Sequence, residues 1–118
     1  MLTVYGYRKC STCRAAFKWL EGRGIAFVDK AIRETPPTER ELRFALGHLG
    51  GEPRRLFNTS GVDYRALGLS AKLPGLSEAE AIRLLAGNGN LVKRPLLIGP
   101  DVALAGFNET EWKAALSG

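Results

Sequence analysis

Two cysteines, separated by two residues, lie between an apolar segment and an amphipathic segment near the start of the chain. Residues 2–7 are rich in β-branched and aromatic side chains and predict a short buried strand. Residues 10–13 read Cys-Ser-Thr-Cys, and apolar residues then recur at helical spacing until the glycines of residues 22–24. Residues 25–29 predict a second strand. Strand, helix and strand within about thirty residues form a βαβ unit, whose two strands run parallel with a right-handed crossover.

The middle of the chain has the signals of helices. Thr38 with Glu41 and Ser77 with Glu80 match the capping box, which marks the first turn of a helix. Each pair precedes apolar residues at helical spacing, and paired or near-paired glycines follow both segments. We therefore expect helices and short helical turns in this block, and no strand.

The last part of the chain returns to the period of strands. Residues 96–98 and 102–107 predict two strands joined by a tight turn, which form an antiparallel hairpin. Asn108 with Glu111 then predicts the start of a terminal helix.

The predicted order is β-α-β, a helical block, and β-β-α, which is an α/β fold. We expect one domain over residues 1–118, with a core of about 1–32 and 92–118 and a helical insertion of about 33–91. Of the 118 residues, 45% are hydrophobic and 25% are charged, which is the composition of a globular chain. A chain of this length can bury a core without a disulfide framework or a structural metal.

Cys10 is placed where a predicted strand ends and a helix begins. The free backbone N–H groups of a first helical turn carry partial positive charge, and Arg8, Lys9 and Arg14 add full charges nearby. Each of these groups should lower the pKa of Cys10 and favour its nucleophilic thiolate. Cys13 lies one turn later on the same side, where it could attack a mixed disulfide on Cys10 and release the product.

The two cysteines allow two other interpretations. They could be core residues, since cysteine favours protein interiors, but the spacing and the βαβ context favour redox chemistry. They could also bind a metal together with His48, which stands late in a predicted amphipathic helix. A lone histidine in that position is more often exposed or part of a cap, so we expect no metal site.

The charge balance and the N-terminal sequence limit the expected partners. The formal net charge is +5, but acidic residues interleave with the basic ones along the whole chain, so direct nucleic-acid binding is not expected. No apolar run approaches the ~20 residues of a spanning helix, and the N-terminus lacks the features of a signal peptide. We therefore expect no membrane partner and a cytoplasmic location, where a close cysteine pair is more often catalytic or sensing than structural.

Three motifs occur in order along the chain. They are Tyr5-Gly6-x-x-x-Cys10-Ser11-Thr12-Cys13-Arg14, Leu56-Phe57-Asn58-Thr59-Ser60-Gly61 followed by Tyr64 and Leu67-Gly68-Leu69, and Lys93-Arg94-Pro95-Leu96-Leu97-Ile98. With them the chain resembles the arsenate reductase family that also contains the Spx and MgsR regulators, over essentially its whole length. The resemblance implies a thioredoxin-like fold with a helical insertion.

Arg94 and Pro95 stand immediately ahead of the predicted hairpin. Thioredoxin-like folds place a proline before the third strand, in a cis peptide bond that faces the active thiols. Only about 5–6% of X–Pro bonds in folded proteins are cis, and a proline that merely starts a strand is the alternative. If Pro95 has the thioredoxin-like role, the Arg94 guanidinium points toward Cys10, where it can pair with an oxyanion or lower the thiol pKa.

The resemblance also bears on individual residues. It implies that Cys10 matches the cysteine of the arsenate reductases and that Arg94 matches one of the three arginines that hold the oxyanion. Asn58 and Phe107 stand where the other two arginines fall, and neither offers a bidentate cationic donor. Cys13 is generally absent from the glutaredoxin-coupled enzymes and present in redox-sensing members that resemble Spx.

These observations predict a thiol–disulfide oxidoreductase that resembles the arsenate reductase family. Cys10 would be the nucleophile, Cys13 the resolving thiol and Arg94 the third catalytic residue. The expected substrate-positioning residues are Pro95, Arg14, Arg8 and Asn58. No bound cofactor is expected, and glutathione, thioredoxin or glutaredoxin would return the electrons.

Two alternative functions remain open. The first is a redox-sensing transcriptional regulator that resembles Spx and binds RNA polymerase. The second is a glutaredoxin-dependent arsenate reductase.

Overall fold

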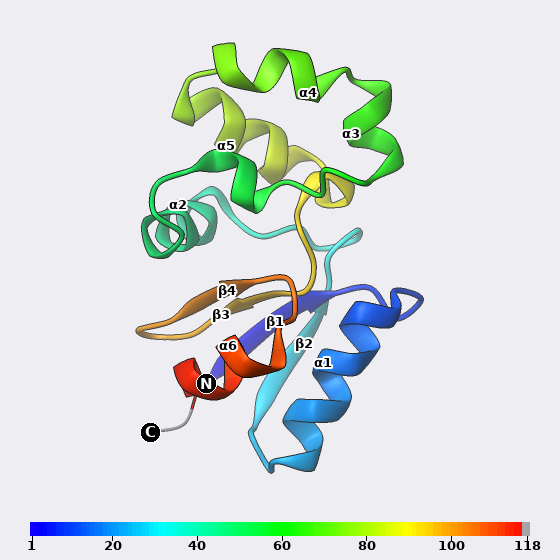
Figure 1. Cartoon of the computed structure of the whole chain (residues 1–118), viewed down its shortest axis with the longest axis vertical. Helices are drawn as coiled ribbons and strands as arrows, with labels where there is room; N and C mark the ends of the chain where they lie inside the picture. The colour runs from blue at the N-terminus through cyan, green and yellow to red at the C-terminus, as the bar shows by residue number, and fades with distance from the viewer. Residues whose placement is uncertain (117–118) are drawn as a thin grey trace.

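The computed structural model describes residues 1–116, whose centre is a four-stranded sheet (Figure 1). Its strands are β1 (Leu2–Gly6), β2 (Phe27–Ala31), β3 (Leu96–Ile98) and β4 (Ala103–Ala105), in the order β2-β1-β3-β4. β1 pairs in parallel with β2 and antiparallel with β3, and β3 and β4 form an antiparallel hairpin. This is the strand arrangement of a thioredoxin-like core, so the predicted fold class is confirmed.

The two faces of the sheet belong to two separate hydrophobic clusters. Val4, Leu97 and Leu104 are opposite one another in the ladder and pack with α1 (Ser11–Gly22) and α6 (Glu109–Leu116). Their immediate neighbours Tyr5, Leu96 and Ala103 belong to the other cluster, which holds the apolar residues of the middle block. This division follows from the two-residue period of a strand, in which successive side chains point to opposite faces.

Helices fill the chain between β2 and β3 and form the half of the molecule away from α1 (Figure 1). They are α2 (Glu39–His48), η1 (Pro53–Leu56), α3 (Val62–Ala66), α4 (Leu69–Lys72), η2 (Leu73–Gly75), α5 (Glu78–Gly87) and η3 (Gly89–Leu91). Both predicted capping boxes are present, at the starts of α2 and α5. Within residues 1–116, none of the helices has the length and apolar character needed to cross a bilayer.

A hydrogen bond ties the first helix of this half to the sheet. The buried Tyr5 hydroxyl donates to Glu41 Oε1 at 2.6 Å, and the same carboxylate accepts from the Thr38 backbone N–H at 3.0 Å as part of its capping box. Burial and the carboxylate both raise the pKa of Tyr5, so the phenol stays protonated and donates. The cap of α2 is thereby held against β1.

The second strand begins two residues later than predicted, at Phe27 rather than at residue 25. The Gly24 N–H donates to the Glu21 carbonyl, the Ile25 N–H donates to the Leu20 carbonyl, and Gly24 has φ +68°. These two bonds form a Schellman motif, which uses Ile25 to close α1. The β-branched residue that suggested a strand therefore belongs to the end of the helix.

The last strand is shorter than the predicted span of 102–107. It ends at Ala105 because Gly106 has φ +74°, which turns the chain out of the ladder. The Gly106 N–H still donates to the Pro95 carbonyl at 2.9 Å. The first strand also stops one residue early, at Gly6.

Candidate functional site

Cys10 is the N-cap residue of α1. Its backbone is extended, with φ −87° and ψ 121°, and its own N–H donates to the Tyr7 carbonyl at 2.9 Å. The thiol is a free, half-buried group at the end of the helix where backbone N–H groups lack carbonyl partners. The Cys10 sulfur therefore lies at the start of the first helix, where the sequence predicted it.

The pKa of the Cys10 thiol is lowered from its ordinary value. Partial burial raises it, but hydrogen bonds from the Cys13 backbone N–H, the Cys13 thiol and the Thr12 N–H act in the opposite direction, as does the charge of Arg94. Together these groups outweigh the cost of burial. A larger fraction of Cys10 is thiolate at neutral pH than for an ordinary cysteine.

Cys13 has the opposite environment. Its side chain is fully buried in the cluster between the sheet and α1, and this burial raises the pKa of Cys13 to about 12, with a further contribution from the neighbouring Cys10. Cys13 is therefore a protonated donor to Cys10 and is closed to reagents from solvent. The first reaction with any disulfide falls to Cys10.

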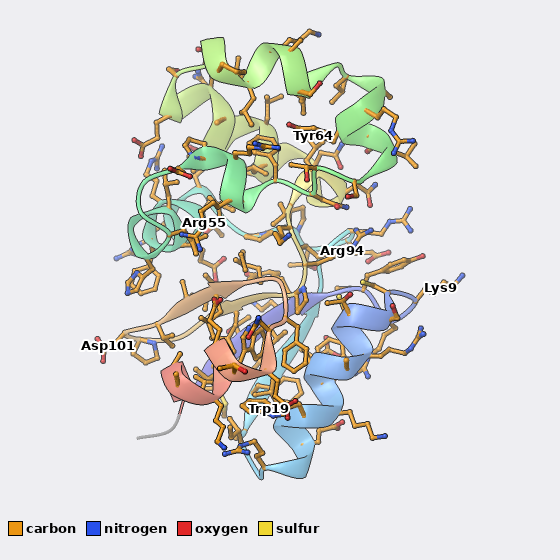
Figure 2. The ribbon with its side chains drawn as sticks, viewed as in Figure 1. Lys9, Trp19, Arg55, Tyr64, Arg94 and Asp101 are labelled. Carbon is orange, nitrogen blue, oxygen red and sulfur yellow. The ribbon has the colours of Figure 1, made fainter. Side chains whose placement is uncertain are left out.

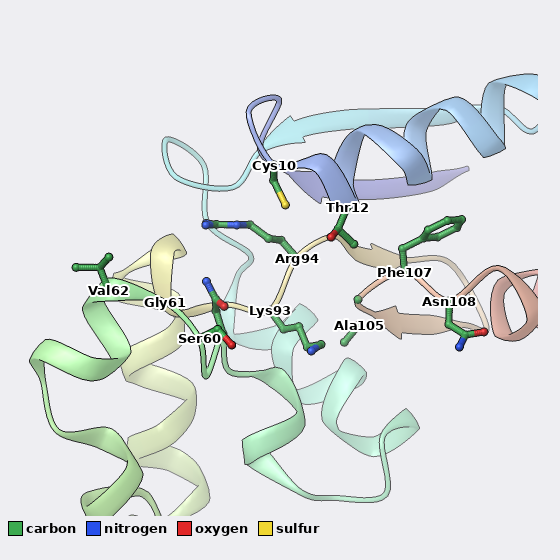
Figure 3. A pocket seen from close by; sticks show the side chains of 12 residues that line it. Cys10, Thr12, Ser60, Gly61, Val62, Lys93, Arg94, Ala105, Phe107 and Asn108 are labelled. Carbon is green, nitrogen blue, oxygen red and sulfur yellow. The ribbon is translucent and has the colours of Figure 1, made fainter.

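Cys10 lies at a cleft of about 630 Å³ between α1 and the helical half (Figure 3). The cleft is formed by four segments: the start of α1, the loop before α3, the residues before β3 and the turn after β4. Its lining includes Cys10, Thr12, Asn58, Lys93, Arg94 and Phe107. Figure 3 shows the Cys10 sulfur pointing toward the Arg94 side chain.

Arg94 comes to the cleft through a cis peptide bond with Pro95, the form that a thioredoxin-like role requires. Pro95 itself is buried and is not among the residues that line the cleft. Figure 2 places Arg94 between the sheet and the upper helices, and its guanidinium carbon lies 5.3 Å from the centre of the Tyr7 ring. Its buried Nη1 has no hydrogen-bond partner among residues 1–116. A buried donor of this kind costs stability unless it is satisfied, so it is available to an anionic ligand.

Arg8 and Arg14 do not join this cleft. Arg8 pairs with Asp29 of β2 and lies 4.7 Å from the centre of the Phe17 ring, and Arg14 donates to the Arg8 carbonyl at 3.1 Å. Neither side chain is among the groups that set the Cys10 pKa, which corrects the expectation that their charges lower it. Both side chains are engaged by partners away from the sulfur.

His48 is also distant from the chemistry. It is exposed at the end of α2, and its Nδ1 lies 3.1 Å from the Phe44 carbonyl oxygen. Its ring packs in a tilted arrangement on Phe44, with ring centres 4.5 Å apart. Asn58, by contrast, lines the cleft as expected, and its backbone N–H donates to the Leu91 carbonyl at 2.7 Å.

Lys93 also lines the cleft, although it is not among the predicted site residues. It precedes Arg94, and its side chain leaves the backbone in a different direction (Figure 3). Its Cε packs on Gly106, where an added Cβ would lie only 2.8 Å away. Its position next to Arg94 in the sequence could have indicated that Lys93 lies near the site. The contact that holds its aliphatic chain there could not be predicted, because Gly106 lies in a turn thirteen residues later.

Replacing Arg94 with glutamine should raise the pKa of Cys10, because a nearby positive charge favours the thiolate. The rate of alkylation by iodoacetamide at pH 7 should then fall several-fold, and the curve of rate against pH should move to higher pH. Arg83→Gln on α5 removes the same charge outside the cleft and serves as the control. An unmoved curve for Arg94→Gln would contradict the assigned role.

Comparison with known proteins finds relatives that match nearly the whole chain. The protein YusI of Bacillus subtilis (strain 168), which has no assigned function, is 43% identical over 95% of each chain. The global transcriptional regulator Spx of Streptococcus pneumoniae (strain ATCC BAA-255 / R6) is 28% identical over 98% of this chain and 86% of its own. The crystal structure of a possible arsenate reductase from Streptococcus mutans UA159 is 44% identical, covers 92% of each chain and superposes with a TM-score of 0.86.

The match to a family extends over nearly all of the described residues. The ArsC family model covers residues 5–115, which include both cysteines, the helical half and the cleft arginine. The chain belongs to the ArsC family.

Proposed function

We propose that the protein is a thiol–disulfide oxidoreductase with Cys10 as the nucleophile and Cys13 as the resolving thiol. The observation that carries this proposal is the asymmetry of the pair. Cys10 borders an open cleft, and the pKa of its thiol is lowered. Cys13, by contrast, is buried, protonated and hydrogen-bonded to Cys10. One thiol is thus ready to attack, and the other is within reach of the product of that attack.

In the first step the Cys10 thiolate attacks one sulfur of a substrate disulfide. A Cys10–substrate S–S bond forms, the substrate S–S bond breaks, and the leaving half departs as a thiolate. Cys10 then no longer carries the negative charge that raised the pKa of Cys13, so Cys13 loses its proton more readily. Its thiolate attacks Cys10, which forms the Cys10–Cys13 disulfide and releases the second half of the substrate.

Over the two steps the cysteine pair loses two electrons and the substrate disulfide gains them. Turnover therefore needs an external thiol reductant. Two molecules of glutathione, or one dithiol protein of the thioredoxin or glutaredoxin type, would reduce the Cys10–Cys13 disulfide by the same exchange chemistry. We place this reaction in the cytoplasm, where those reductants are kept reduced.

The direct test is to trap the intermediate. When Cys13→Ser protein meets a small disulfide such as bis(2-hydroxyethyl) disulfide, its intact mass should rise by one substrate half, and the adduct should map to Cys10. The wild-type chain should instead lose two hydrogens and carry no adduct. An adduct on Cys13 of the Cys10→Ser variant, formed at the same rate, would reverse the assigned roles and overturn the proposal.

A second candidate is a redox-sensing regulator, which the likeness to Spx over 98% of this chain favours. The same cysteine chemistry would then act as a switch, and the partner would be RNA polymerase. This function predicts that one redox form of the chain retains purified RNA polymerase on a column and the other does not. If neither form retains it, this candidate fails.

Arsenate reduction is the remaining candidate, since a similar solved structure is described as a possible arsenate reductase. Arg94 lines the cleft, but Asn58 and Phe107 provide an amide and a phenyl ring beside it. These groups offer less to a doubly charged oxyanion than guanidinium groups would. Arsenite formation with glutathione and glutaredoxin supplied would establish the activity, and its absence would exclude it.

A further inference from the structure

Two smaller cavities share lining residues with the cleft. One, of about 350 Å³, shares Lys93 with the cleft and adds Arg54 and Arg55. The other, of about 210 Å³, shares Arg94 with the cleft and adds Arg33. The cavity with Lys93 is called the Lys93 flank of the cleft, and the cavity with Arg94 is called the Arg94 flank. Each flank therefore carries cationic side chains.

The two flanks arise from one local feature of the chain. Lys93 and Arg94 are consecutive residues ahead of β3, and their side chains leave in different directions (Figure 3). The Arg94 guanidinium extends toward the loop of Gly61 and Val62, whereas the Lys93 side chain extends toward Ala105. One substrate bound at Cys10 would thus meet a cation on either side.

Around the cleft the cationic side chains outnumber the acidic ones. Within residues 1–116 the ion pairs are Arg8–Asp29 and Arg43–Glu39, and neither involves the cleft. No acidic residue lines the central cleft. The Lys93 flank has Glu52 against three cations. The Arg94 flank has Asp63, which accepts from the Asn88 side chain, against Arg33 and Arg94. The local charge of each flank is therefore positive.

The positions of these cations are set by packing. The Lys93 aliphatic chain rests on Gly106, which holds it at the edge of the cleft. On the same flank, Arg55 donates to the Leu49 carbonyl at 3.1 Å, which leaves Lys93 and Arg54 as the cations available to a ligand. On the other flank, Arg33 and Arg94 lie 4.9 Å and 5.3 Å from the centre of the Tyr7 ring, and Arg94 keeps its unpartnered Nη1.

We infer that the substrates of the proposed reaction are low-molecular-weight disulfides whose thiol halves carry carboxylate groups. This inference rests on the proposed function and names its substrate class. With the disulfide at Cys10, one carboxylate lies at Arg94 and Arg33 and the other at Lys93 and Arg54. The cavity sizes are in the range of small-ligand sites. Positive charge on both flanks attracts a dianionic substrate and repels a cationic one.

The test compares three disulfides of similar size and different charge: 3,3′-dithiodipropionate, bis(2-hydroxyethyl) disulfide and cystamine. The measured quantity is the rate constant for mixed-disulfide formation in full-length Cys13→Ser protein, divided by that of a free thiol with the same reagent. At low salt the normalised rate constant should be about tenfold higher for the dianion, 3,3′-dithiodipropionate, than for the neutral disulfide. It should be lowest for the dication, cystamine. The advantage should shrink as ionic strength rises.

Substitution then locates the source of the preference. Lys93→Gln and Arg54→Gln should each lower the ratio of dianion to neutral rate about threefold or more. Lys72→Gln, on α4, removes the same charge outside these cavities and should leave the ratio unchanged. Fast reaction with no charge preference, or an equal fall in the ratio with Lys72→Gln, would overturn the inference alone. If all three disulfides react no faster than with a free thiol, the proposed function itself fails.

Discussion

The Cys10→Ser variant should reduce a small neutral disulfide at least about 1,000-fold more slowly than the wild-type chain. A serine hydroxyl is not ionised at neutral pH and cannot form the mixed disulfide. Cys13 cannot replace the lost thiol, because it is fully buried and its pKa is raised mainly by that burial, which the substitution leaves in place. The measurement is the initial rate of thiol release in single turnover, with the pre-reduced protein in excess.

The pH dependence of the wild-type reaction supplies the internal control. Because folding lowers the Cys10 pKa, the rate should rise with pH and level off before the range in which an ordinary cysteine ionises, near ~8.5. In denaturing urea the thiol should titrate in that ordinary range. A wild-type profile that matches the denatured chain would show that the folded site does not activate Cys10.

The location of the reactive pair could be predicted because each of its determinants is local in sequence. The strand of residues 2–6, the start of α1 and the spacing of the cysteines lie within about a dozen residues, so period and spacing were enough to place Cys10 at a helix start. The capping pairs that begin α2 and α5 were predictable for the same reason. A cap uses residues three positions apart, and no distant contact changes it.

Side-chain directions could not be predicted in the same way. Arg8 is two residues from Cys10 in sequence, yet its partner Asp29 lies on β2, which the parallel pairing of β1 and β2 brings close. Lys93 reaches the cleft because Gly106, after β4, leaves room for its aliphatic chain. Both outcomes depend on which strands are neighbours, and no local pattern contains that information.

The shift of β2 has a different cause, which is competition between two local signals. Ile25 fits a strand by its side chain, but it also fits the position after a helix-ending glycine, where an apolar residue packs back on the helix. Gly24 has a positive φ, and Ile25 joins the cluster beneath α1. The glycine decides the outcome, because it lets the helix close with two hydrogen bonds before any strand can begin.

The Gly89→Ala variant should lose about 3 kcal/mol or more of unfolding free energy, which for a chain of this size is a fall in Tm of roughly 10 °C. Gly89 is buried at the start of η3, against the backbone that leaves β2. A Cβ there would overlap the Ile32 carbonyl oxygen and lie 2.7 Å from the Ile32 carbonyl carbon. Both obstacles are backbone atoms, so no change of rotamer relieves the clash, and η3 must move away from the sheet.

Gly87→Ala is the matched control, two residues earlier at the end of α5. No atom lies within 4 Å of the place where its Cβ would go, and alanine has the higher helix propensity, so its stability should change by less than about 1 kcal/mol. Both variants can be followed by urea denaturation with tryptophan fluorescence, since Trp112 is buried beside the sheet. Equal stability of the two variants would mean that the close approach of η3 to Ile32 is not required by the fold. A large loss for Gly89→Ala alone would show that this contact joins the helical half to the sheet. Gly89 lies four residues before the consecutive pair Lys93 and Arg94, which line the cleft.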